Sequence, residues 1–341
     1  MKITRSQIET LFSDFEGKHV MILGDVMIDA YLWGKVDRIS PEAPVPVVSV
    51  SKRDNLLGGA ANVALNIKAL GAVPVLCSVV GDDLKGSEFV ELLHKDGISD
   101  EGIVKSAERI TTTKFRIIGN KAQMLRVDEE IDTDLSESDE NRLIEKVLSV
   151  FNKLPIGVVI VQDYNKGVLT RRIIDKVLEM SGSRGIPVVV DPKKKNFDAY
   201  RNVDLFKPNL KELREGLKID VELNEADKIR QAVKEWQSRQ SIAAMMVTLS
   251  EAGVFIRDVS GSEVEEHHIP AHVRNIADVS GAGDTVISIA SLCRALKVSP
   301  FLTASLANLA GGLVCEYVGV VPVNRSHLLN EALELIADDQ A

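Results

Sequence analysis

Short apolar runs alternate with amphipathic stretches along most of the chain. Ile8, Leu11, Phe12 and Phe15 share one face of a predicted helix, and residues 19–23 follow as a predicted buried strand. Similar runs, with helical stretches between many of them, recur at 73–80, 158–162, 187–190, 205–206 and 244–249. This alternation predicts an α/β fold in which helices cover both faces of a mostly parallel sheet. Ligands of such sheets bind beyond the carboxyl ends of the strands, so the polar motifs that follow these runs are expected to share one site.

Two segments depart from this rhythm and are typical of antiparallel strands outside the main sheet. One is the alternating run 44–51, and the other is 111–127, in which Gly119 and Asn120 separate two apolar-alternating arms. Strands this apolar need a partner surface, so we expect a small β-sheet that covers a site as a lid, with strands from about 31–52 and 111–128. The alternative is a decorated edge of the main sheet. We expect residues 1–341 to form a single domain.

The composition is that of an ordinary globular protein. With 341 residues, of which 45% are hydrophobic, the chain can bury a large core. Its 41 Lys and Arg residues against 50 Asp and Glu give a formal net charge of −9, so neither nucleic acid nor a membrane surface is expected as a partner. An anionic substrate must therefore be held by a local basic site.

The cysteines and the N-terminal residues indicate a reducing compartment. Cys77, Cys293 and Cys315 are far apart in apolar surroundings and form no Cys-x-x-Cys pair, so we expect neither disulfides nor a zinc site. No stretch of about 18 apolar residues is present to cross a bilayer, and charged residues near the N-terminus interrupt any signal-peptide pattern. We expect a cytoplasmic protein.

The most informative motif is the octapeptide 278–285, Asp-Val-Ser-Gly-Ala-Gly-Asp-Thr, which precedes an apolar helical run. The Gly281-Ala282-Gly283 turn leaves backbone N–H groups uncovered, and the helix that follows adds its unpaired first-turn donors, so the two together predict an anion cradle. An acidic residue beside a phosphate cradle is electrostatically unfavourable, which suggests that Asp284 accepts a proton from a group that attacks the phosphate. The alternative is a tight turn in which Asp284 only caps the helix.

Two further motifs offer hydrogen-bonding groups for a polar ligand. Gly58 and Gly59 open a predicted helix, where they would let a ligand lie against the backbone, and Asn62 offers an amide that can donate to and accept from hydroxyls. Asp25 and Asp29 follow the first strand, where carboxylates accept hydrogen bonds well from sugar hydroxyls. Close helix packing for the glycines, and turn or helix caps for the carboxylates, are the alternatives.

Three motifs at the ends of later strands fit a nucleotide and its metal. Asn209 and Glu212 are hard oxygen ligands three residues apart that could hold Mg²⁺ directly or through its waters, and a helix-capping box has the same spacing. Within the Lys run at 193–195, only Lys193 is expected to contact a phosphate. The turn at 248–253 could shelter an adenine or a ribose, although that motif is weak on its own.

Taken in order, these motifs resemble those of the ribokinase or phosphofructokinase B family of sugar kinases. The resemblance covers nearly the whole chain and rests on four elements: Gly58-Gly59-x-x-Asn62, Asn209-x-x-Glu212, the 248–253 turn and the 278–284 block. It implies a ribokinase-like three-layer fold with a small β-sheet lid, ATP as the phosphoryl donor and Mg²⁺ as its metal. It also implies a homodimer, because lid strands of this family often pair between subunits.

The resemblance also implies roles for individual residues. Asp284 would be the catalytic base, beside an anion hole formed by Gly281, Ala282 and Gly283. The ATP phosphates would be bordered by Asn209, Leu210, Lys211 and Glu212, with Asn209 and Glu212 at the Mg²⁺, and the nucleoside by Thr248, Ser250 and Gly253. The sugar would be bound by Asp29, Gly58, Gly59 and Asn62, and the anionic groups, including a phosphate of the substrate, by Arg38, Lys166 and Lys193.

Within the family, three strings, at 23–29, 38–47 and 163–169, are most similar to those of kinases that phosphorylate glycero-manno-heptose 7-phosphate at its anomeric hydroxyl, a step toward lipopolysaccharide precursors. Another sugar or sugar phosphate as acceptor, or a non-catalytic sugar-binding regulator, are the alternatives. Ser280 stands where the family more often has Thr. The sequence ends at Ala341 without a nucleotidyltransferase-like block, so we expect a separate enzyme to complete the nucleotide-activated heptose.

Overall fold

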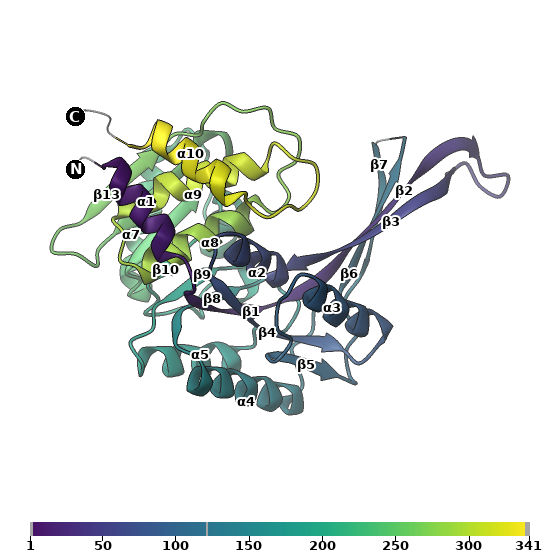
Figure 1. Cartoon of the computed structure of the whole chain (residues 1–341), viewed down its shortest axis with the longest axis horizontal. Coiled ribbons are helices and arrows are strands. Elements are labelled where there is room, and N and C mark those ends of the chain that lie inside the picture. Colours follow the sequence, from purple (N-terminus) through teal and green to yellow (C-terminus); the bar gives the residue numbers. More distant parts are fainter. Residues whose placement is uncertain (1–2, 121, 338–341) are drawn as a thin grey trace.

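A large twisted sheet with helices on both faces forms the body of the protein, and a small sheet projects from one side of it (Figure 1). The computed structural model describes residues 3–120 and 122–337, so the last residues of the chain, including Ala341, lie outside the described part. The strand order of the large sheet is β13-β12-β11-β10-β9-β8-β1-β4-β5. Neighbouring strands are parallel from β5 across to β11, whereas β12 and β13 are antiparallel additions at one edge. The expected mostly parallel sheet is therefore confirmed.

The strands of the large sheet follow the apolar runs of the sequence closely. Their bounds are β1 His19–Gly24, β4 Val73–Gly81, β5 Ile103–Ser106, β8 Ile156–Gln162, β9 Val188–Asp191, β10 Leu205–Phe206, β11 Ala244–Thr248, β12 Val254–Asp258 and β13 Glu265–Ile269. The helices are α1 Arg5–Asp14, α2 Ala60–Ala69, α3 Leu84–Lys95, α4 Glu137–Lys153, α5 Arg171–Gly182, α6 Leu210–Leu217, α7 Ala226–Gln240, α8 Ala282–Ala295, α9 Pro300–Val314 and α10 Arg325–Leu335. No helix among the described residues is long and apolar enough to span a membrane.

Two hydrophobic cores, one on each face of the large sheet, give the protein three layers. Successive residues of a strand point to opposite faces, so Val20 and Ile22 of β1 enter one core while Met21 and Leu23 enter the other. The first core packs against α1, α2, α8, α9 and α10, and the second against α4, α5, α6 and α7. In Figure 1, α4 and α5 lie on the opposite side of the sheet from α2 and α8. The expected ribokinase-like layering is thus present.

The small sheet has the strand order β3-β2-β6-β7 and comes from the two segments that depart from the helix-strand rhythm. Its strands are β2 Val26–Ile39, β3 Pro46–Gly59, β6 Thr113–Gly119 and β7 Ala122–Glu129. The β2–β3 and β6–β7 pairs are antiparallel, whereas β2 and β6 are parallel. One residue lies between the end of β1 and the start of β2, and β3 continues directly into α2. The strands of the small sheet are therefore longer than the expected 31–52, because they also include residues 26–30 and 53–59 next to the body.

The polar motifs lie at one edge of the large sheet, where the parallel strands end. β1, β8, β9 and β11 end at Gly24, Gln162, Asp191 and Thr248, and residues beyond these ends approach the start of α8. Because carboxyl ends of parallel strands meet at the same edge, Gln162 of β8 and Asp191 of β9 come within hydrogen-bond distance. The packing of α2 against α8 brings Asn62 and Asp284 together, although they are 222 residues apart. This edge, below the root of the small sheet, holds the site.

Candidate active site

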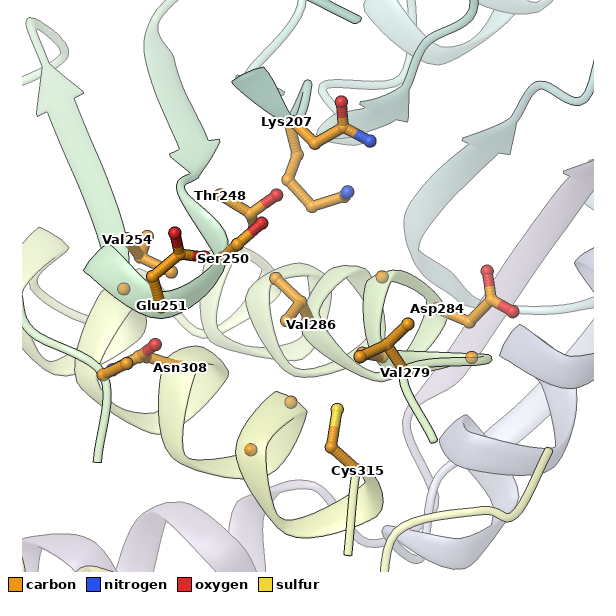
Figure 2. Close-up of a pocket in the computed structure, with 18 of the residues that line it drawn as sticks. Lys207, Thr248, Ser250, Glu251, Val254, Val279, Asp284, Val286, Asn308 and Cys315 are labelled. Carbon is orange, nitrogen blue, oxygen red and sulfur yellow. The ribbon is translucent and has the colours of Figure 1, made fainter. Parts of the chain in front are cut away.

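A pocket of about 740 Å³ opens between the strand ends of the large sheet and the start of α8. Its walls include the loops after β9, β10 and β11, the first turn of α8 and part of α9. Figure 2 shows Asp284 on one side of this space and Thr248, Ser250, Glu251 and Asn308 on the other, with Lys207 between them. The volume falls within the range of about 300–1,000 Å³ that is usual for sites of small ligands.

The first turn of α8 exposes backbone donors to the pocket. Gly281 is the N-cap and has a φ of 80°, in the left-handed region that suits glycine, and no side chain of the described residues caps the helix. A Cβ at position 281 would lie 3.0 Å from Asn62 Nδ2, so a side chain here would also crowd that amide. Gly283 and the uncapped N–H groups of the first turn therefore present the positive end of the helix dipole to a ligand, as the anion cradle requires.

Asp284 is a buried carboxylate with three neutral donors. It accepts hydrogen bonds from Asn62 Nδ2 at 2.7 Å, from the Tyr164 hydroxyl at 2.7 Å and from Gln162 Nε2 at 3.2 Å. Burial raises the pKa of Asp284 to about 6, with Asp191 adding to the increase, while the hydrogen bonds from Asn62 and Tyr164 and the charge of Lys207 oppose it. A carboxylate with such a pKa is a proton acceptor suited to reactions near neutral pH.

Lys207 places a buried positive charge beside the anion cradle. Its side chain is 2% exposed, and its Nζ lies 3.0 Å from Asp191 Oδ2. The same Nζ lies 3.8 Å from where a Gly283 Cβ would be, so the cation faces the cradle. Asp191 Oδ1 is buried without a hydrogen-bond partner among the described residues. A phosphate in the cradle would therefore lie close to a lysine that is buried away from solvent, so their attraction would be weakly screened.

Sequence reasoning missed Lys207, Asp191, Gln162 and Tyr164 as members of the site. The signal that could have found them is position, because Gln162 and Asp191 are the last residues of β8 and β9, and Lys207 directly follows β10. Tyr164 lies two residues beyond the end of β8. Each has a polar side chain at the carboxyl end of a parallel strand, where sites of this architecture form.

Asn209 and Glu212 form a capping box at the start of α6. Glu212 N donates to Asn209 Oδ1 at 2.8 Å, and Asn209 N donates to Glu212 Oε2 at 2.8 Å. Lys193 Nζ binds the other oxygen of Glu212. Burial raises the pKa of Glu212, with Asp191 adding to the increase and Lys207 and Lys193 opposing it. The capping alternative weighed from the sequence is thus present, and both side chains still line the pocket.

Of the other candidates for the nucleotide, some line the pocket and others do not. Thr248, Ser250 and Gly253 line the pocket together with apolar side chains, and the turn that carries them is closed by a hydrogen bond from Leu249 N to Gly253 O of 2.7 Å. Leu210 packs on the second core, and the Lys211 side chain is 82% exposed. Lys211 thus faces solvent.

The expected sugar ligands meet where the small sheet joins α2. Asp29 of β2 is 3% exposed and forms an ion pair with Arg116 of β6. A Cβ at Gly58 would overlap the Asp29 carboxylate, so the glycine is needed for this approach. Gly59 is the N-cap of α2, which carries Asn62. Asn62 Oδ1 is buried and has no partner among the described residues, which leaves an acceptor free for a ligand hydroxyl.

The basic candidates for a second anion do not all come together. Lys193 lines the pocket, and its Nζ lies 5.5 Å from the centre of the Tyr164 ring. Lys166 pairs with Glu130 at 2.6 Å, and the same carboxylate binds Lys114 of β6 at 3.1 Å. Arg38 lies opposite Val47 near the outer end of β2, so the fold of one chain does not bring it to the pocket.

Asp25, which the sequence offered together with Asp29 as a possible sugar ligand, binds the loop after β8 instead. Its carboxylate accepts from the backbone N–H groups of Tyr164, Lys166 and Val168, at 2.8, 3.1 and 3.0 Å. Burial and the nearby charge of Asp163 raise the pKa of Asp25 to about 6. Asp25 thereby fixes the loop that carries Tyr164 and Lys166.

The residues described do not by themselves form a typical protein metal centre. Among residues 3–120 and 122–337, no group of three or more His, Cys, Asp or Glu side chains is arranged to hold a metal ion. Mg²⁺ commonly keeps several waters and relies on one or two protein carboxylates plus the phosphates of a nucleotide. Asn209 and Glu212 line the pocket with the unpartnered Asp191 Oδ1 in the same wall, and this set fits that sparse mode.

Comparisons with known proteins agree with this architecture. A model of the pfkB family carbohydrate kinases matches residues 18–326. Bifunctional protein HldE of Citrifermentans bemidjiense is 35% identical over 327 residues, covering 96% of this chain and 66% of that protein. The protein of the same name from Caulobacter sp. strain K31 is 38% identical over 325 residues, covering 93% of this chain and 63% of its own length. The chain therefore spans somewhat less than two thirds of these relatives.

Solved structures show the same fold at low identity. Escherichia coli phosphofructokinase-2 in complex with potassium matches with a TM-score of 0.77 and 18% identity, covering 94% of this chain and 99% of that one. Arabidopsis thaliana ribokinase complexed with ribose and ATP matches with a TM-score of 0.67 and 18% identity, covering 92% of this chain and 99% of that one.

The family match extends over most of the described chain and includes every element that builds the pocket. Enzymes of this family are phosphotransferases that use ATP and act on a sugar hydroxyl. The buried carboxylate, the uncapped helix start and the pocket described above fit that chemistry. The chain therefore belongs to the pfkB family of carbohydrate kinases.

Proposed function

We propose that this sugar kinase phosphorylates the anomeric hydroxyl of glycero-manno-heptose 7-phosphate, with Mg-ATP as donor, to give the 1,7-bisphosphate. The strings at 23–29, 38–47 and 163–169 support this acceptor, because the general family motifs do not choose among sugars. The similarity to the HldE proteins extends over 93–96% of the chain and agrees with that choice.

The observation that carries the proposal is Asp284, a buried carboxylate with a pKa of about 6 at the uncapped start of α8. In the proposed reaction, Asp284 takes the proton of the acceptor hydroxyl while that oxygen attacks the γ-phosphorus of ATP. The bond from phosphorus to the bridging oxygen breaks, and ADP leaves. The backbone N–H groups of Gly281, Ala282 and Gly283, with Lys207, stabilise the charge on the phosphoryl oxygens.

The nucleotide is proposed to lie along the pocket away from Asp284. Thr248, Ser250 and Gly253 would border the nucleoside, and the segment from Asn209 to Glu212 the phosphates. Mg²⁺ would be held at Asn209 and Glu212 through its waters, since the side-chain oxygens of both residues already take part in the capping box. The ion would neutralise phosphate charge.

The sugar is proposed to lie at the root of the small sheet, bound by Asp29, Gly58, Gly59 and Asn62. The unpartnered Asn62 Oδ1 supports this position, because a buried acceptor without a donor is costly until a ligand hydroxyl satisfies it. Lys166 and Lys193 are proposed for the anionic groups of the substrates. Because Arg38 lies far along β2 from this chain's own pocket, its proposed role requires the second copy of a homodimer.

The proposed homodimer would form through the small sheet, which then acts as a lid. Leu125 and Val127 of β7 are 55% and 44% exposed, although they lie beside Ile117 and Phe115 on one face of the sheet. An exposed apolar strand face is a typical site of protein association. A nucleotidyltransferase is expected to act on the product after this kinase.

Incubation of the purified protein with Mg-ATP and a panel of acceptors tests the function. The panel contains heptose 7-phosphate, free heptose, fructose phosphates and ribose, and products are identified by mass spectrometry. A bisphosphate from heptose 7-phosphate alone is the expected result. Turnover of another acceptor would keep the mechanism and overturn the substrate, and no turnover with any acceptor would favour a sugar-binding regulator.

A further inference from the structure

The two oxygens of the Asp284 carboxylate have different surroundings. Oδ1 accepts from the Tyr164 hydroxyl at 2.7 Å and from Gln162 Nε2 at 3.2 Å. Oδ2 accepts from Asn62 Nδ2 alone, at 2.7 Å, among the donors of the described residues. A carboxylate oxygen offers about two lone-pair sites, so Oδ1 is saturated and Oδ2 keeps one site open.

We propose that Tyr164 and Gln162 are positioning residues that saturate Oδ1, so that Oδ2 is the atom that takes the proton of the acceptor hydroxyl. This inference rests on the proposed role of Asp284 as the base. The open site on Oδ2 lies beside Asn62. Asn62 Nδ2 also lies near the anion cradle, because a Cβ built on Gly281 would be 3.0 Å from it. Asp284 thus lies beside the cradle and next to Asn62, which is where the proposal places the sugar hydroxyl.

The fold holds both donors in place before any substrate binds. Gln162 ends β8, and its Nε2 also donates to Asp191 Oδ2 at 3.2 Å, which fixes the orientation of the amide. Tyr164 belongs to the loop whose backbone N–H groups bind the buried Asp25 carboxylate. Lys193 Nζ lies over the Tyr164 ring, 5.5 Å from its centre. These additional contacts hold Gln162 and Tyr164 in place, and donors that are held in place keep the carboxylate in one orientation.

The charges that face Asp284 come from three neighbouring segments. Asp191 at the end of β9 raises its pKa, and Lys207 after β10 lowers it. Lys193 also faces Asp284, because that carboxylate is among the charges that raise the lysine's pKa. Burial and the charge of Asp284 raise the pKa of Tyr164 well above its ordinary value, so its hydroxyl remains a donor at every working pH. Removing this hydroxyl leaves the surrounding charges unchanged and deletes one stabilising partner of the ionised Asp284.

The test is the pH profile of kcat/KM for Tyr164→Phe, measured with whichever acceptor the wild-type enzyme turns over. The lost hydrogen bond favours the protonated carboxyl, so the acid limb should move to higher pH by about one unit, with the KM for ATP little changed. The matched control is Tyr200→Phe. Tyr200 is fully buried, and its hydroxyl donates to Asp163 at 2.8 Å rather than to Asp284, so the acid limb of this variant should coincide with that of the wild type.

An unshifted acid limb in a folded Tyr164→Phe would overturn the proposal. Inactivity at every pH with both substrates still bound would also overturn it, because Tyr164 would then contact the reacting atoms. If Tyr164→Phe fails to fold, Gln162→Met removes the other Oδ1 donor and must give the same upward shift.

A readout without turnover separates this proposal from the proposed function. The ¹³C-carboxyl resonance that disappears in Asp284→Asn is titrated in the wild type and in Tyr164→Phe. An upward shift of its pKa supports the positioning role even if the enzyme phosphorylates none of the sugars tested, and equal pKa values contradict it.

Discussion

At the scale of single residues, the burial that suits Asp284 to its proposed role as the base is costly for folding. Because its pKa in the folded protein is raised from 3.8 to about 6, the folded state holds a proton more tightly than the unfolded state does. The stability that this proton contributes is fully present below the unfolded pKa and is lost as the pH rises through about 6. At neutral pH the ionised carboxylate therefore reduces stability.

We expect Asp284→Asn to lower activity and to raise the stability of the folded protein. Loss of the base should lower kcat by about 10²–10⁴-fold while sugar binding, measured by calorimetry, is kept. The apo variant should be more stable than the wild type at pH 8, by about 1 kcal/mol, because no charge is buried. This gain should shrink as the pH is lowered to 4.

Urea unfolding of both proteins across this pH range measures the difference. Normal turnover by Asp284→Asn would remove Asp284 as the base. An Asn variant that is less stable than the wild type at pH 8 would show that the lost hydrogen bonds outweigh the removed charge.

At the scale of elements, the start of α6 is both a capping box and part of the pocket wall, and the sequence could not separate capping from ligand binding. Asn209 and Glu212 satisfy the first donors of the helix as a capping box, and they also line the pocket. The same spacing suits both roles, because a helix start that points at a ligand uses the same oxygens to cap and to bind.

Two substitutions at position 209 separate these roles. Asn209→Ala should lower the free energy of unfolding by about 1 kcal/mol, whereas Asn209→Ser should keep it, since serine caps helices as well as asparagine does. If Asn209 also serves Mg-ATP, both variants should show a raised KM for Mg-ATP. A Ser variant with wild-type stability and wild-type kinetics would restrict Asn209 to capping.

The elements themselves could largely be predicted from the sequence, because their apolar runs are short and well separated. β1, β4, β8 and β11 agree with the predicted runs to within a residue or two, and the site motifs follow them. The parallel pairing of β2 with β6 could not be read from the sequence, since it joins residues 85 positions apart, such as Ile28 and Thr113. The partners of Asp284 could not be read either, because Asn62, Gln162 and Tyr164 meet it only through the packing of α2 and β8 against α8.

At the scale of the whole molecule, the small sheet is the part on which the proposed assembly depends. Its outer strands expose apolar side chains, among them Val50 of β3 and Leu125 and Val127 of β7, in a chain whose formal net charge is −9. A proposed homodimer through this sheet would bury the exposed face and bring the outer end of β2, with Arg38, to a second copy.

Leu125→Glu tests this assembly. A charge on the exposed face of β7 should convert a dimer to a monomer in light scattering coupled to size-exclusion chromatography, because burying the carboxylate in an apolar interface is costly. Leu84→Glu is the control, since Leu84 is 89% exposed at the start of α3, outside the small sheet. A wild-type protein that is already monomeric at micromolar concentration would contradict the proposal.

Asp25 connects the small sheet to the site within one chain. It is the single residue between β1 and β2, its carbonyl accepts from Ala60 N at 2.9 Å where β3 passes into α2, and its carboxylate holds the Tyr164 loop. The start of β2, the end of β3 and the Tyr164 loop are thus all fastened at one residue. If the small sheet closes over a sugar as proposed, a movement at the root of β2 and β3 would be transmitted through Asp25 to the Tyr164 loop, and so to the hydroxyl that binds Asp284.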